Sequence, residues 1–90
     1  MITNKTHEAL VILAEECAEV IQAIAKIHRF GPDSVYNGLS NKISLEKEIG
    51  DVLCLVDILM GQSVIDPDAL VHYKEQKRIK LHTYSNLFSE

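Results

Sequence analysis

The feature that most constrains this chain is a long stretch, residues 3–30, that contains neither proline nor glycine. Within it Leu10, Leu13 and Cys17 recur at intervals of three and four, the spacing that puts side chains on one face of an α-helix. Proline and glycine are the residues that most weaken a helix, and both are absent here. The sequence therefore predicts one long helix over about residues 3–30.

Two further helices follow from the turn residues and the returning periodicity. A Gly-Pro pair ends the first helix and opens a loop, residues 31–41, whose length favours a lid over the site. Helical spacing then resumes over about residues 42–61. The Asp66-Pro67-Asp68 segment supplies an N-cap, a first-turn proline and a first-turn acid, which predicts a third helix over about residues 66–82.

The length and apolar content of the chain indicate an all-α bundle that is completed by association. At 90 residues it forms a single predicted domain, residues 1–90, yet 47% of its residues are hydrophobic. A domain this small cannot bury so much apolar surface alone. We expect two long antiparallel helices per chain, with the third helix alongside, and a four-helix core completed in a homo-oligomer, a dimer or a tetramer.

The charge balance and the cysteines exclude several classes of function. The net charge of −4 lacks the broad cationic surface that nucleic-acid binding requires, although a bound cation and local lysines still permit a small anionic substrate. No apolar run has the length of a membrane span or the form of a signal peptide. Cys17 and Cys54 are isolated within helical patterns, which is typical of reduced thiols in a cytoplasmic protein.

Carboxylates interrupt the apolar stripes of both long helices. On the second helix Glu48 falls inside the stripe near Val52, and Asp51 faces the same side one turn on. On the first helix Glu16 falls inside the stripe and Glu19 borders it. Burying an ionised carboxylate without a counter-charge costs several kcal/mol or shifts its pKa until the group is neutral. Positive charge is therefore expected among these acids.

The spacing of the acids predicts a metal site. Glu16 with Glu19 and Glu48 with Asp51 each stand three residues apart, so each pair projects from one side of one helical turn. Two antiparallel helices can bring all four carboxylates to one point. Oxygen-only ligands suit magnesium, manganese or calcium and not zinc, and a phosphate substrate favours magnesium, with manganese as the alternative.

Two simpler interpretations compete with the metal site. Acids at this spacing often do no more than solvate an amphipathic helix. Buried acids can also be neutralised in salt bridges, for which Lys26, Arg29 and Lys47 are the candidates.

The order and spacing of the acids resemble a known family. Glu15-Glu16-Cys17-Ala18-Glu19, followed by Glu48-Ile49-Gly50-Asp51, is similar to the EExxE and ExxD motifs of the MazG-like all-α nucleoside triphosphate pyrophosphatases. The likeness covers about residues 8–82. The resemblance implies hydrolysis of a nucleoside triphosphate between its α and β phosphates, with magnesium held by the same four residues: Glu16, Glu19, Glu48 and Asp51.

The same resemblance assigns the catalytic position to Glu15, which would orient or deprotonate the attacking water or touch a second metal. Lysines elsewhere are candidate phosphate ligands, because Lys26 shares a helix face with Glu15 and Glu19. The third helix gathers a cationic and aromatic face that can clamp phosphates and stack a base, although lysines on a terminal helix also serve simply to solvate it. The members of that face are Tyr73, Lys77, Lys80 and Tyr84, with Lys74 beside them.

Two other functions remain open from the sequence. One is a non-catalytic helical interaction protein whose core acids are neutralised by lysines. The other is a metal-dependent phosphohydrolase that acts on a different nucleotide phosphoanhydride.

Overall fold

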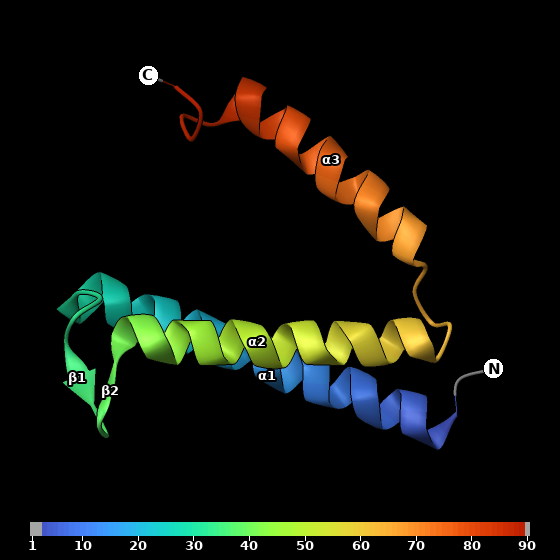
Figure 1. Ribbon diagram of the computed structural model, residues 1–90, viewed down its shortest axis with the longest axis horizontal. Coiled ribbons are helices and arrows are strands. Elements are labelled where there is room, and N and C mark those ends of the chain that lie inside the picture. The colour runs from blue at the N-terminus through green and yellow to red at the C-terminus, as the bar shows by residue number, and fades with distance from the viewer. Residues whose placement is uncertain (1–2, 90) are drawn as a thin grey trace.

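A computed structural model describes residues 3–89 of the chain; the predicted domain range 1–90 also includes residues 1, 2 and 90, which lie outside the described part. All three predicted helices are present and the all-α class is confirmed. In chain order the elements are α1 (Asn4–Phe30), β1 (Val35–Tyr36), β2 (Leu39–Ser40), α2 (Asn41–Gly61) and α3 (Pro67–Tyr84), as Figure 1 shows.

Side-chain caps and a glycine fix where α1 begins and ends. The hydroxyl of Thr3 accepts a hydrogen bond from the backbone N–H of Thr6 at 3.1 Å and satisfies one of the free donors of the first turn. At the other end Gly31 leaves the helix with φ 87°, a conformation that favours glycine, and its N–H donates to the carbonyl of Ile27 at 2.8 Å.

The other two helices begin at polar caps. Ser40 caps α2 by accepting from the N–H of Ile43 at 3.2 Å, so the helix starts slightly before the predicted residue 42. Asp66 caps α3 by accepting from the N–H of Asp68 at 3.1 Å, with Pro67 in the first turn as its sequence predicts.

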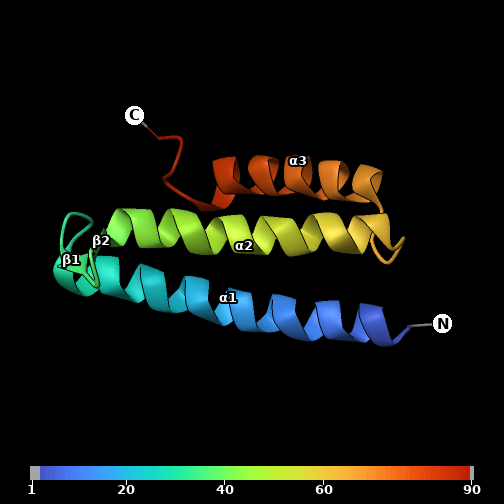
Figure 2. The ribbon, with the colours of Figure 1, turned by 60° about the horizontal axis from the view of Figure 1, so that its bottom comes forward.

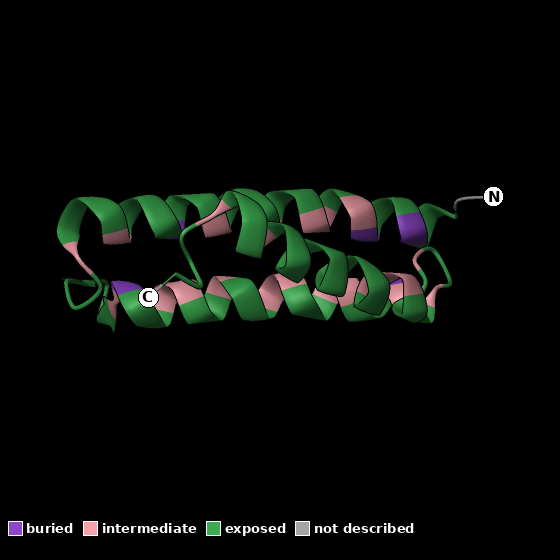
Figure 3. Cartoon of the chain, turned by 90° about the horizontal axis from the view of Figure 1, so that it is seen from above, coloured by how far each residue is buried: buried purple, intermediate pink, exposed green. Residues whose placement is uncertain are grey.

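Helices α1 and α2 pack antiparallel along a seam with regular spacing. The residues with low exposure recur at alternating intervals of three and four on both helices, and Figure 3 shows these surfaces turned toward each other. Ala9, Ala23 and Leu59 are the fully buried apolar residues of this seam. The seam comprises Thr6, Ala9, Leu13, Glu16, Val20, Ala23 and Ile27 on α1, and Asn41, Leu45, Glu48, Val52, Leu55, Leu59 and Gln62 on α2.

The loop between the long helices, expected to lack regular structure, contains a small β-hairpin. Its strands are antiparallel, with Val35 opposite Ser40 and Tyr36 opposite Leu39. Asn37 and Gly38 form the turn with φ 52° and 80°, the positive values that a two-residue hairpin of this kind needs and that an Asn-Gly pair adopts readily.

Asn41 ties the loop to the end of α1. Its side chain is buried, and its amide nitrogen donates to the carbonyl of Gly31 at 3.0 Å and to that of Lys26 at 3.4 Å. Its backbone N–H also donates to the carbonyl of Ser34 at 2.9 Å. Several hydrogen bonds therefore hold the hairpin in one place over the helix end.

The third helix stands apart from the other two, so the expectation that it packs alongside them is not met within one chain. None of its residues is buried, and Figures 1 and 2 together show α3 leaving the end of α2 at an angle. The chain is flat, with extents of 44 × 38 × 14 Å. The physical reason is that α3 is mostly polar and has no continuous apolar stripe that would hold it against α1 and α2.

Large apolar side chains remain uncovered on every helix. On the long pair they include Ile21 at 68% and Leu53 at 58% exposure, and on α3 Val71 at 67%. Such surface is typical of a chain that associates, and the predicted four-helix core stays a prediction. Among residues 3–89 no helix combines the length and the apolar character needed to cross a membrane.

Candidate metal centre between the long helices

Four carboxylates from the two long helices converge on one point. One oxygen from each of Glu16, Glu19, Glu48 and Asp51 lies within 4.8 Å of an oxygen of every other member. These are the four residues that the sequence singled out as metal ligands, and the structure brings all of them together.

The seam explains how the carboxylates are held. Glu16 and Glu48 occupy seam positions of α1 and α2 that are otherwise filled by apolar side chains, so both are partly buried. Glu19 and Asp51 follow one turn later on their helices and lie at the border of the seam, where Glu19 is exposed to solvent. Two acids thus form the floor of the site and two form its rim.

The floor acids Glu16 and Glu48 form no ion pair with any cation among residues 3–89. One carboxylate oxygen each of Glu16 and Glu48 is buried without any hydrogen-bond partner. The single ion pair among residues 3–89 joins Lys42 to Glu46 at 3.2 Å on the exposed side of α2, away from the seam. The salt bridges from Lys26, Arg29 or Lys47 that would neutralise the acids are therefore not formed.

The pKa of both floor acids is raised above its ordinary value. For Glu16 the pKa is raised first by burial and then by repulsion from Glu19 and Asp51. For Glu48 it is raised chiefly because the protonated carboxyl can hydrogen-bond Glu19, then by burial and repulsion, while Lys47 partly offsets the rise. Both directions mean that the site favours an added positive charge, supplied by a proton or by a cation.

The donor set fits a hard divalent cation. All four groups offer carboxylate oxygens, the ligands that magnesium, manganese and calcium prefer. Oxygens on opposite sides of a magnesium ion lie about 4 Å apart, and around calcium about 5 Å apart. The four carboxylate oxygens lie within 4.8 Å of one another, which is of this size. The buried oxygens of Glu16 and Glu48 have no hydrogen-bond partner and are free to bind a cation.

A hollow of about 320 Å³ opens beside the acids on the polar side of the seam. Lys26, expected from the sequence to contact substrate, lines it together with Glu19 and Glu48. Gln22 and Ser44 were not predicted to lie at the site, although their helical spacing from Glu19 and Glu48 was a signal for it. The remaining lining residues are Gln22, Ala23, Ser44 and Lys47.

Glu15 lies outside the group of four. It is exposed on α1, and because it precedes Glu19 by four residues it shares the side of the helix on which the hollow opens. This position is compatible with a role at the mouth of the site.

The predicted substrate residues of α3 are not brought to the acids by their own chain. All of them are exposed on a helix that stands away from α1 and α2. Lys74 and Lys77 instead line a separate hollow of about 260 Å³ on α3, together with Arg78, Leu81 and Phe88. The residues concerned are Tyr73, Lys74, Lys77 and Lys80.

Fold and site together define a class of protein: an all-α chain in which two antiparallel helices join two carboxylate pairs into one cluster whose oxygens fit a divalent cation. The chain belongs to the MazG nucleotide pyrophosphohydrolase family, because the model of the MazG nucleotide pyrophosphohydrolase domain matches residues 5–66. A comparison with curated proteins finds no match, and neither does a comparison with solved structures.

The family match covers α1, the hairpin and α2 but ends before α3. The likeness expected from the sequence ran to residue 82, so it was too long at its carboxyl end. This agrees with the separation of α3 from the site in the single chain.

Proposed function

We propose that the protein hydrolyses a nucleoside or deoxynucleoside triphosphate between its α and β phosphates, releasing the monophosphate and pyrophosphate, with magnesium bound by Glu16, Glu19, Glu48 and Asp51. The observation that carries this proposal is the cluster of four carboxylates, two of which hold buried oxygens without a partner. Membership of the pyrophosphohydrolase family supports the reaction class.

The division between floor and rim suits this chemistry. A bound divalent cation neutralises non-bridging phosphate oxygens and aligns the phosphorus for attack. Glu16 and Glu48 are held in the seam and would supply rigid ligands, whereas Glu19 and Asp51 lie one turn on, at its border. The hollow that would admit the substrate is lined by Glu19 and Glu48. Magnesium is the cation we propose, with manganese as the alternative.

Two residues of α1 are proposed to act on the substrate side. Glu15, exposed near Glu19, is the candidate to orient the attacking water and accept its proton. Lys26 lines the hollow beside Glu19 and Glu48, so its ammonium group is available for a phosphate oxygen.

The cationic helix α3 is proposed to serve the site of a neighbouring copy. It carries four basic and two acidic residues, while the part of the chain from α1 to α2 is net acidic. This separation of charge favours contact between α3 of one copy and the acidic side of another. Across such an interface the following residues would contact the nucleotide: Tyr73, Lys74, Lys77 and Lys80.

The test is release of pyrophosphate from a panel of ribo- and deoxynucleoside triphosphates, with magnesium and with chelator. We expect product only with the divalent metal, and a loss of at least about 100-fold in kcat for Glu48→Gln, the range typical of removing one charge-stabilising group. Glu46→Gln is the matched control, because Glu46 lies two residues away in an exposed ion pair and should retain activity.

Other outcomes would refute the proposal in distinct ways. A folded wild-type protein that releases nothing from any nucleotide would favour the helical interaction protein. Orthophosphate instead of pyrophosphate would indicate a phosphohydrolase acting on another bond.

A further inference from the structure

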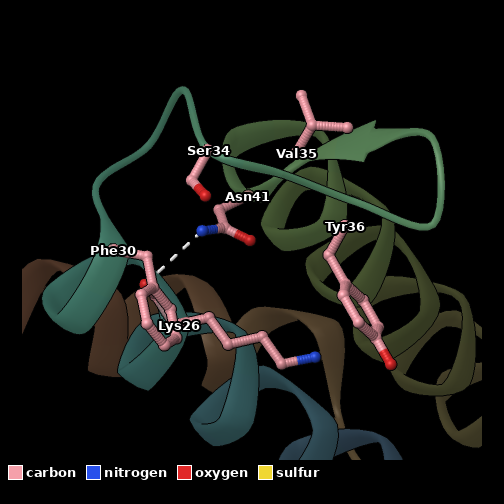
Figure 4. Close-up of a pocket in the computed structure, with 6 residues that line it drawn as sticks. All are labelled: Lys26, Phe30, Ser34, Val35, Tyr36 and Asn41. Atoms are coloured by element: carbon pink, nitrogen blue, oxygen red, sulfur yellow. Dashed lines mark hydrogen bonds between the residues drawn. The ribbon is translucent and has the colours of Figure 1, made fainter.

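A third hollow, of about 330 Å³, lies under the β-hairpin at the carboxyl end of α1. The proposed function so far uses only one of its residues, Lys26. Figure 4 shows the others arranged around an open space between the end of the helix and the hairpin. The lining residues are Lys26, Phe30, Ser34, Val35, Tyr36 and Asn41.

The aromatic rings at this hollow are exposed although their backbones are held in place. Tyr36 is 64% and Phe30 59% exposed to solvent. Tyr36 belongs to the paired hairpin and Phe30 to the last turn of α1, and the buried Asn41 ties the two segments together through Gly31. A flat apolar surface is thus presented without the cost of ordering it when a ligand binds.

We propose that this hollow binds the nucleobase of the substrate, with the ring of Tyr36 as the stacking surface; the inference rests on the proposed function. In the free protein the ammonium group of Lys26 lies 4.9 Å from the centroid of the Tyr36 ring. Stacking of a base on an aromatic side chain is generally stronger than an exposed cation–π contact. A base can therefore take that face of the ring and leave Lys26 free for a phosphate.

The two hollows are adjacent along α1 and share a residue. Lys26 lines both the hollow beside the acids and the one under the hairpin. It follows Glu19 by seven residues, so the two lie on the same side of the helix about 10 Å apart along its axis. A nucleotide with its phosphates at the carboxylates thus has its base directed toward the hairpin end.

Asn41 supplies the polar contact of this hollow. Its amide nitrogen is already committed to two backbone carbonyls, of Gly31 and Lys26, which leaves its amide oxygen as a fixed acceptor. Figure 4 shows that oxygen on the side that faces Tyr36. The base is therefore expected to present an N–H to this oxygen, and a triphosphate analogue whose base edge carries no N–H should have a raised KM.

Steady-state kinetics of three hairpin variants test the inference on a nucleotide that the wild type hydrolyses. Tyr36→Ala should raise KM about 5- to 100-fold with kcat within about twofold, because it removes one stacking partner remote from the reacting phosphate. Tyr36→Phe keeps the ring and should match the wild type. Leu39→Ala is the control, because Leu39 pairs with Tyr36 across the hairpin but does not line the hollow.

A binding measurement separates this inference from the proposed reaction. Titrating a free nucleoside into metal-free protein should shift the backbone NMR signals of residues 30–41 in the wild type and not in Tyr36→Ala. An unchanged KM for Tyr36→Ala in an active enzyme, or shifts confined to other residues, would overturn the inference alone. If Tyr36→Ala caused an oligomer to dissociate, the inference would be overturned too, because the hairpin would then be a contact between subunits. An inactive wild type that still shows the hairpin shifts would refute only the reaction.

Discussion

The four carboxylates place like charges together without an ion pair, and Glu48 is the residue at which the cost in stability is best measured. Glu48→Gln removes one negative charge and gives the seam an amide that can donate to Glu19. We expect the metal-free variant to melt at or above the temperature of the wild type, because a repulsion is lost. Addition of magnesium should stabilise the wild type and have much less effect on the variant.

Thermal melts with chelator and with magnesium check this expectation, with Glu46→Gln as the surface control. Exposed ion pairs contribute about 0 to 1 kcal/mol, so the control should change little and keep its response to metal. Severe unfolding of Glu48→Gln would instead mean that Glu48 serves as a structural partner in the seam.

The raised pKa values of Glu16 and Glu48 also predict how the stability of the metal-free protein depends on pH. In the folded protein each carboxyl has a pKa above the ordinary value of 4.5 and therefore binds its proton more tightly than in the unfolded chain. The folded state therefore holds more protons than the unfolded state between 4.5 and the raised values. The free energy of unfolding should fall as pH rises through this window. Above the window these two groups should cause no further fall.

Urea unfolding in chelator at several pH values from about 4.5 to 7.5 measures this dependence. Glu48→Gln should reduce the slope, because one of the two groups no longer titrates. A slope identical in wild type and variant would contradict the prediction, and saturating magnesium should flatten the dependence in the wild type by holding the acids ionised.

At the scale of elements, the helices and the acid cluster follow from local patterns. The absence of proline and glycine from residues 3–30 and the Asp66-Pro67 cap are signals that act within a few residues, and they predict α1 and the start of α3. The convergence of Glu16 and Glu48 was predictable because each interrupts a stripe that only a partner helix can cover.

The parts of the structure that the sequence did not predict depend on contacts between distant residues, or lie in segments too short to show a periodic pattern. The hairpin strands are two residues each, too short for a periodic signal, and only their Asn-Gly turn was visible. The hollow beneath them exists because Asn41 reaches back to Gly31, a hydrogen bond between residues ten apart. The position of α3 away from α1 and α2 was also not predicted, because the cap and the first-turn residues determine where a helix begins and not what it contacts.

At the scale of the whole molecule, the two sides of the α1–α2 pair differ in character. Glu19, Glu48 and Lys26 line a hollow on one side of the seam. On the other side a shallow apolar hollow crosses both helices, lined by Cys17, Val20, Ile21, Ile49 and Val52. A chain only 14 Å thick in its shortest dimension cannot cover this side by itself. We infer that a second copy covers it and completes a four-helix core.

Ile21→Lys tests this arrangement, because Ile21 is 68% exposed in the single chain and borders the apolar hollow. Burying an unpaired ammonium group in an apolar interface costs far more than leaving it in water, so the variant should shift the assembly toward the monomer. Size-exclusion chromatography with light scattering gives the mass directly. Val11→Lys is the control, since Val11 is also exposed on α1 but does not line that hollow. A wild type that is monomeric at micromolar concentration, or an Ile21→Lys variant of unchanged mass, would mean that the four-helix core is not closed through this side. If a monomeric wild type still hydrolysed nucleotides, α3 of a neighbouring copy would not be needed at the site.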